Sequence, residues 1–140
     1  MLRHEFTPLE IDEASLAFGA HEEVGHAGHF FGAAHTLERA DMVAVTLPAL
    51  CELVWVLAQG YKVDAPEIAA AIRGLINSAN VVVSRPAAEA GLALLEAGGD
   101  FADGVIAFEG SRLGAETFVS FDKKAVRLLA GQGEASRLLA

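Results

Sequence analysis

Acidic side chains in three separate segments are the residues of this chain that are best suited to chemistry. Glu52 is the only formal charge between Met42 and Gln59, and Asp103 and Asp122 each stand near the start of a predicted helix. A glutamate in so apolar a stretch reaches solvent, pairs with a buried cation or takes part in a reaction, because an unpaired buried charge is costly. If the three acids meet, they form an oxygen-only site that suits Mg²⁺ or Mn²⁺ rather than zinc.

The aspartates also have a purely structural explanation. Asp100 is placed to cap a helix with Asp103 in its first turn, and Asp122 is placed to cap a helix that follows a strand. The sequence leaves open whether these residues only cap helices or also bind a cation. In the second case, the cation could activate water and clamp phosphate oxygens during phosphodiester cleavage. Without it, the carboxylates should raise one another's pKa and destabilise the protein near neutral pH.

Alternating strand and helix patterns predict the scaffold that positions these acids. We expect strands at 42–46, 80–83 and 117–121. We expect helices over 48–59, from the Asp64 cap to about 78, from Pro86 to Gly98, from Asp100 to near Gly114, and from Asp122 onward. Strands separated by helices pair in parallel through right-handed crossovers, so the fold class is α/β. Binding sites in such folds lie at the carboxyl ends of the strands.

Length and composition indicate a single domain, residues 1–140, with a sizeable core. The 140 residues are 53% hydrophobic and 21% charged, which excludes a disordered polar chain. The net charge of −9 argues against a protein that coats nucleic acid, although an enzyme that holds a metal through carboxylates can still act on it. Cys51 stands alone, so neither a disulfide framework within the chain nor a cysteine-rich zinc site is expected. We expect it to be a packing residue.

Targeting signals are weak in this sequence. The first ten residues lack the apolar core of a signal peptide, and the nearly uncharged stretch 42–60 contains a proline and a glutamate. We interpret that stretch as buried core rather than as a membrane span. We expect Trp55 and Phe108 to pack in the interior rather than to stack on bases. The expected location is the cytoplasm, with no membrane contact.

The first 41 residues differ in composition from the rest. They carry eight acidic and two basic residues and all five histidines: His4, His21, His26, His29 and His35. No linker accompanies the change, so we interpret 1–41 as an atypical segment of the same domain. His26 and His29 would share a helix face with i,i+3 spacing, and with His21 and Glu22 they raise a weaker hypothesis of a histidine metal site. A solvated polar face explains them more simply.

Three motifs in order resemble the PIN-domain ribonucleases, and most closely the VapC-type toxins of bacterial toxin–antitoxin pairs. They are LCELVWVL at 50–57, DFADGVIA at 100–107 and FVSFDKKA at 118–125. The resemblance covers about residues 37–129. It implies a three-layer α/β/α sandwich with a parallel sheet, and a metal-dependent endoribonuclease that hydrolyses RNA phosphodiester bonds with Mg²⁺ or Mn²⁺. It also implies a small antitoxin protein as partner and a homodimer.

By position in these motifs, the resemblance assigns metal binding and catalysis to Glu52, Asp103 and Asp122, with Asp100 as a peripheral support. Lys123, Lys124 and Arg127 follow Asp122 and would steer an RNA phosphate, unless they are simply a solvated helix end.

The N-terminus departs from the family pattern. The family begins with an apolar strand that runs into Asp-Thr-Asn or Asp-Thr-Ser, whereas this chain has PLEIDEAS at 8–15. Asp12, 40 residues before Glu52, stands where the first family acid would fall and is the fourth expected ligand. If Asp12 does not bind metal, the alternative is a catalytically impaired PIN-like module that pairs with an antitoxin or with itself.

Overall fold

The computed structural model describes residues 35–140. Asp12, His21, His26 and His29 lie outside this range, so the hypotheses that concern them stay predictions. Most of the atypical segment 1–41 also lies outside the described range.

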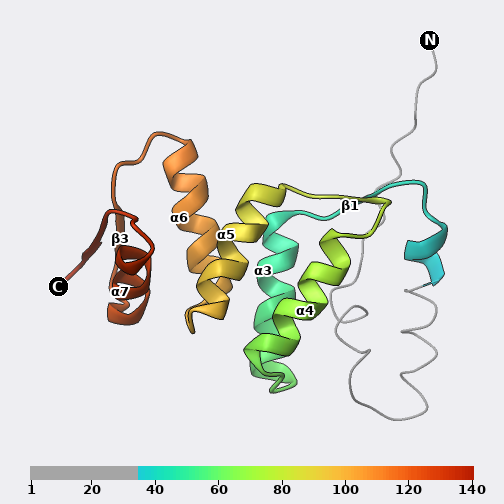
Figure 1. Ribbon diagram of the computed structural model, residues 1–140, viewed down its shortest axis with the longest axis horizontal. Coiled ribbons are helices and arrows are strands. Elements are labelled where there is room, and N and C mark those ends of the chain that lie inside the picture. The colour runs from blue at the N-terminus through green and yellow to red at the C-terminus, as the bar shows by residue number, and fades with distance from the viewer. Residues whose placement is uncertain (1–34) are drawn as a thin grey trace.

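Strands and helices alternate along the described chain in the predicted order (Figure 1). Three strands fall where they were expected, namely β1 (Val43–Ala44), β2 (Val81–Val82) and β3 (Phe118–Ser120). The five predicted helices are also present, as α3 (Leu47–Trp55), α4 (Ala65–Ile76), α5 (Arg85–Glu96), α6 (Phe101–Arg112) and α7 (Lys123–Gly131). A fourth strand, β4 (Ser136–Leu138), was not expected.

Local signals account for where the helices begin and end. Helices α3, α4 and α5 each have a proline in the first turn, where a missing N–H costs nothing. Helices α6 and α7 begin instead at the aspartate caps Asp100 and Asp122. Gly98 and Gly114, with φ of 93° and 95°, follow the ends of α5 and α6, because a residue with a Cβ rarely adopts that backbone conformation.

The strands form two parallel pairs, which confirms the α/β pairing. Val43 of β1 is in register with Val81 of β2, and Phe118 of β3 with Ser136 of β4. Within residues 35–140 these pairs are two separate two-stranded sheets, and they lie far apart along the long axis of the molecule (Figure 1). The structure therefore supports a mixed helix and strand fold with short parallel strands. The three-layer sandwich stays a prediction.

One large hydrophobic core joins β1 and helices α3 to α6. Its fully buried members include Leu50, Ile68, Ile72, Leu92 and Phe101. A smaller cluster of Leu94, Ala107 and Leu129 attaches α7 to the α5–α6 pair. Helix α6 packs against α5 and also contacts α3, with Phe101 and Val105 in the main core, so the backbone that carries Asp100 and Asp103 is held against that core.

Helices α5 and α6 approach each other closely through glycines. A Cβ placed on Gly104 of α6 would lie 2.5 Å from the backbone oxygen of Ala90, and a Cβ on Gly91 of α5 would lie 2.7 Å from the ring of Phe101. Only a residue without a side chain allows this approach. Gly104 directly follows Asp103, so the contact sets the position of that carboxylate.

One face of the apolar stretch 42–60 is buried in the core, as predicted, and its other residues are partly or fully exposed. Leu50, Leu53, Val54 and Leu57 are buried, at the i, i+3, i+4 and i+7 spacing of a helix that faces a core. Trp55 is 62% exposed, so the prediction that it packs in the core is wrong. No helix among residues 35–140 combines the length and the apolar character needed to cross a membrane.

Candidate functional site

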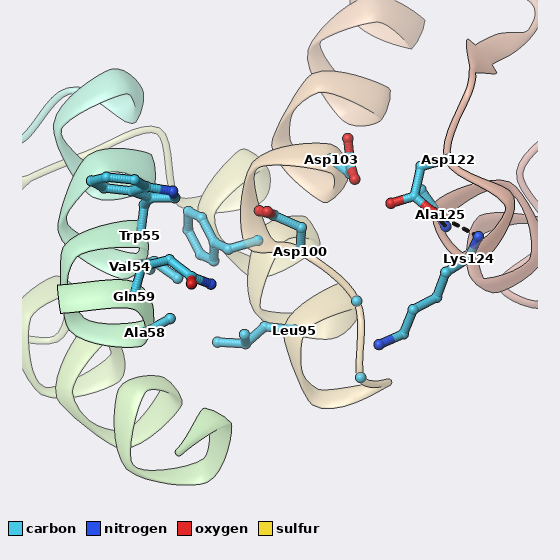
Figure 2. A pocket seen from close by; sticks show the side chains of 13 residues that line it. Val54, Trp55, Ala58, Gln59, Leu95, Asp100, Asp103, Asp122, Lys124 and Ala125 are labelled. Atoms are coloured by element: carbon cyan, nitrogen blue, oxygen red, sulfur yellow. Dashed lines mark hydrogen bonds between the residues drawn. The ribbon is translucent and has the colours of Figure 1, made fainter. Parts of the chain in front are cut away.

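A pocket of about 250 Å³ lies between α3 and the N-terminal ends of α6 and α7. The wall from α3 and the π-helical turn η1 (Val56–Gly60) includes Trp55 and Gln59, and the opposite side carries polar groups from the two helix starts: Asp100, Asp103, Asp122 and Lys124 (Figure 2). Asp103 and Asp122 were predicted for the site, and Asp100 was expected only as a support. The pocket brings these three acids together.

Asp100 and Asp122 cap their helices, as predicted. The Asp100 Oδ1 accepts a hydrogen bond of 2.8 Å from the N–H of Ala102. The Asp122 Oδ1 accepts bonds of 2.7 and 3.2 Å from the N–H groups of Lys124 and Ala125. Each cap holds a carboxylate in a fixed place at the rim of the pocket and engages one of its two oxygens. The second oxygen of each aspartate accepts no hydrogen bond from residues 35–140, which suits it to a ligand.

Asp103 differs from the two capping residues. Its side chain is half-buried, and no donor in the described part of the chain hydrogen-bonds to its carboxylate. Burial raises the pKa of Asp103, and the negative charges of Asp100 and Asp122 raise it further. The expected mutual repulsion among the acids is therefore present at Asp103. A cation in the pocket would relieve this repulsion.

The donor chemistry of the pocket fits a hard divalent cation, because all three acids offer oxygen. Within residues 35–140, however, no group of three or more His, Cys, Asp or Glu side chains is arranged to hold a metal ion by itself. Mg²⁺ usually keeps several waters and binds through one or two carboxylates together with substrate phosphates. Asp103 with one capping aspartate matches that smaller donor set.

Glu52 lies outside this pocket. It is exposed on α3, one turn before Trp55, and none of its atoms is among those that line the cavity. Of the three alternatives that the sequence left open for Glu52, the structure matches a side chain that reaches solvent. Its role as a metal ligand stays a prediction, as does that of Asp12 beyond the described range.

Of the three basic residues near the start of α7, Lys124 lines the pocket, whereas Lys123 and Arg127 are exposed on the same helix and do not. The Lys124 side chain extends along the pocket below Asp122 (Figure 2). An ammonium group there can bind a phosphate that approaches the carboxylates, which would otherwise repel it.

Trp55 is the pocket residue whose position the sequence reasoning missed. The signal was available, because the buried stripe of Leu50, Leu53, Val54 and Leu57 already fills one face of α3. The residue after Val54 points about 100° away from Val54 around the helix. This rotation takes Trp55 off the buried face and to the rim of the pocket.

Cys51 lies near the pocket without lining it. The thiol is half-buried and packs against the core. Burial and, second, the charge of Asp100 raise the pKa of Cys51, while a backbone hydrogen bond lowers it by less. A thiol with a raised pKa is a poor nucleophile, in agreement with the packing role predicted for it.

Comparison with protein-family models, with curated proteins and with solved structures finds no match to this chain, so the function must be argued from the pocket and its residues.

Proposed function

We propose that this protein is a metal-dependent endoribonuclease of the PIN-like type that hydrolyses phosphodiester bonds of RNA. The observation that carries the proposal is the half-buried carboxylate of Asp103, which lines one pocket with two further aspartates and whose pKa is raised by burial first and then by their charges. A carboxylate with a perturbed pKa in a cleft is typical of functional sites, and Asp103, unlike Asp100 and Asp122, has no helix cap to explain its position. The motifs that resemble PIN-domain ribonucleases assign Asp103 and Asp122 to the site, with Asp100 as a peripheral support, and they add Glu52, which lies outside the pocket.

In this reading Asp103 binds the cation in its ionised form, and Asp100 or Asp122 contributes the oxygen that the helix cap leaves free. When bound, Mg²⁺ or Mn²⁺ supplies a water of lowered pKa and offsets the charge that develops on the phosphate. The Lys124 ammonium pairs with a non-bridging phosphate oxygen and orients the phosphorus toward the pocket. A water would attack the phosphorus, one P–O ester bond would break, and the leaving oxygen would take up the proton that the water loses.

The resemblance carries the finer features of the proposal. They are a three-layer α/β/α sandwich, a small antitoxin protein that binds the nuclease, a homodimer and a cytoplasmic location. Glu52 and Asp12 belong to the same set of proposed metal ligands. Glu52 lies on α3 but outside the pocket, so this part of the proposal requires a movement that brings its carboxylate to the metal.

The test is cleavage of RNA by the full chain with Mg²⁺, with Mn²⁺ and with a chelator. Asp103→Asn should lower the cleavage rate by about 100-fold or more, the usual cost of removing a group that stabilises charge in the transition state. Asp64→Asn is the control, because it makes the same change at another aspartate near the start of a helix, and Asp64 lies outside the pocket. Activity that survives chelation, or equal activity of the Asp103 variant and the wild type, would refute the proposal.

A second candidate is the catalytically impaired binding module. One observation favours it, namely that Glu52 and the three pocket aspartates are not arranged within residues 35–140 to hold an ion directly. A module of this kind would bind its partner protein with the same affinity in the wild type and in Asp103→Asn, and neither form would cleave RNA in any metal.

A further inference from the structure

Trp55 is exposed where its chemistry would be expected to bury it. It is the sole tryptophan of the chain, and 62% of its surface is accessible, although its neighbours Leu53 and Val54 are buried. Tryptophan side chains are highly buried on average, so an exposed indole beside a pocket is typical of a binding surface.

The surroundings of the indole restrict what it can bind. Trp55 and Gln59 form one wall of the pocket, and Asp100 and Asp103 lie across from them (Figure 2). The pocket of about 250 Å³ is smaller than the roughly 300–1,000 Å³ of sites for drug-sized ligands. It can therefore accept one flat group, but not a helix or strand of a partner protein.

The backbone next to Trp55 is unusual as well. From Val56 to Gly60 the chain forms a π-helical turn, in which the N–H of Tyr61 bonds to the carbonyl of Val56 at 3.1 Å. Such turns are rare and occur often at functional sites, because the wider turn changes the direction of the side chains that follow. Here it carries Gln59, whose amide offers both donors and an acceptor, on the same wall as the indole.

We propose that the indole of Trp55 is the stacking platform for an unpaired nucleobase adjacent to the phosphate that enters the carboxylate pocket. The inference deepens the proposed function and rests on it for the identity of the ligand. Every nucleobase has a flat π face, so stacking on an aromatic side chain positions a nucleotide without selecting its sequence. Trp55 is thus a positioning residue that compensates for the weak electrostatic attraction of an acidic protein for RNA.

Binding of a short single-stranded RNA tests this proposal, measured in Asp103→Asn with Mg²⁺ so that the RNA is not consumed. The emission of the sole tryptophan should be that of a water-exposed indole and should be quenched as RNA binds. With a fluorescently labelled RNA, Trp55→Ala should weaken binding about 5- to 150-fold, the range expected for one lost base–aromatic stack. Trp55→Phe, which keeps a flat ring, should restore most of the affinity.

Two controls separate stacking from other effects. Leu113→Ala removes an apolar side chain that is 89% exposed at the far end of α6, and it should leave RNA affinity unchanged. Inorganic polyphosphate has charge but no bases, so Trp55→Ala should not alter its binding. The proposal would be overturned if Trp55→Ala bound RNA as tightly as the Asp103→Asn protein into which it is introduced. It would also be overturned if Trp55→Ala weakened the binding of RNA and of polyphosphate equally.

Three further outcomes are distinguishable. If Trp55→Ala instead changes the oligomeric state in solution, the indole belongs to a protein interface and the proposal is wrong. If RNA quenches the indole but the wild type cleaves no RNA in any metal, the nuclease assignment fails while the stacking role stands. If the wild type cleaves RNA and Trp55→Ala cleaves and binds it equally well, the stacking role fails alone.

Discussion

Replacing Gly104 by alanine should destabilise the protein and disturb the pocket, because the new methyl group would meet the backbone of α5. The added Cβ would lie 2.5 Å from the Ala90 oxygen and 2.9 Å from the Gly91 Cα. Ordinary contact begins at 3.4 Å, so the first distance is about 0.9 Å too short. A helix backbone cannot rotate out of the way as a side chain can, and the two helices must separate.

The size of the effect follows from two opposing contributions. Overpacking a well-packed interface costs about 1–3 kcal/mol. Alanine is better than glycine in a helix by about 1 kcal/mol, which offsets part of that cost. Because the clash is with backbone, we expect the upper part of the range and a net loss of about 1–2 kcal/mol in the free energy of unfolding. For a chain of this size that lowers the Tm by about 2–8 °C.

Urea unfolding followed by circular dichroism measures this loss, and Gly110→Ala is the matched control in the same helix. A Cβ at Gly110 would meet only the Ala115 Cβ, at 3.8 Å, so the helix preference of alanine should stabilise that variant by up to about 1 kcal/mol. If the two alanine variants have the same stability, the close approach of α5 and α6 is not the constraint that holds Asp103 in place.

Two further predictions concern the pocket aspartates. Asp103→Asn should be more stable than the wild type at neutral pH and equal to it in acid. Because the pKa of Asp103 is raised in the folded state, the stability of the wild type falls as the pH rises from the unfolded-state pKa through the folded-state pKa. Urea unfolding of both proteins at several pH values measures this fall. A stability difference between them that does not change with pH would contradict the prediction. Asp122→Ala should lower the free energy of unfolding by about 0.5–2 kcal/mol, because the two cap hydrogen bonds of Asp122 disappear. Asp122→Asn, in which asparagine caps equally well, should unfold near the urea concentration at which the wild type unfolds. Equal unfolding midpoints for the two Asp122 variants would argue against the cap.

Local chemistry made the helices and three strands predictable. Prolines in first turns and aspartate caps act within a few residues. The structure confirms the prolines of α3, α4 and α5 and the caps Asp100 and Asp122, whereas the side chain of Asp64 makes no cap hydrogen bond. The capping roles of Asp100 and Asp122 were likewise readable, because a cap bonds to N–H groups only two or three residues away.

The arrangement of the site was less accessible to sequence reasoning. Asp100 lines the pocket and its charge raises the pKa of Asp103, although we expected Asp100 only as a support. Glu52, which we expected as a ligand, lies outside the pocket. Trp55 was misassigned because an apolar side chain in an apolar stretch was taken to be interior. β4 was missed because Ser136–Leu138 is short and only partly apolar, and its pairing with β3 is a long-range contact.

The sequence by itself therefore determined the five helices α3 to α7, the first three strands, and which acids stand at helix starts. Those properties depend on the backbone preferences and hydrogen bonds of neighbouring residues. Only the tertiary structure decided that Asp100, Asp103, Asp122 and Lys124 share one pocket with an exposed Trp55. The reason is that these groups meet through the packing of α3, α5, α6 and α7 against one another, in which the absence of a side chain at Gly104 matters as much as any charge.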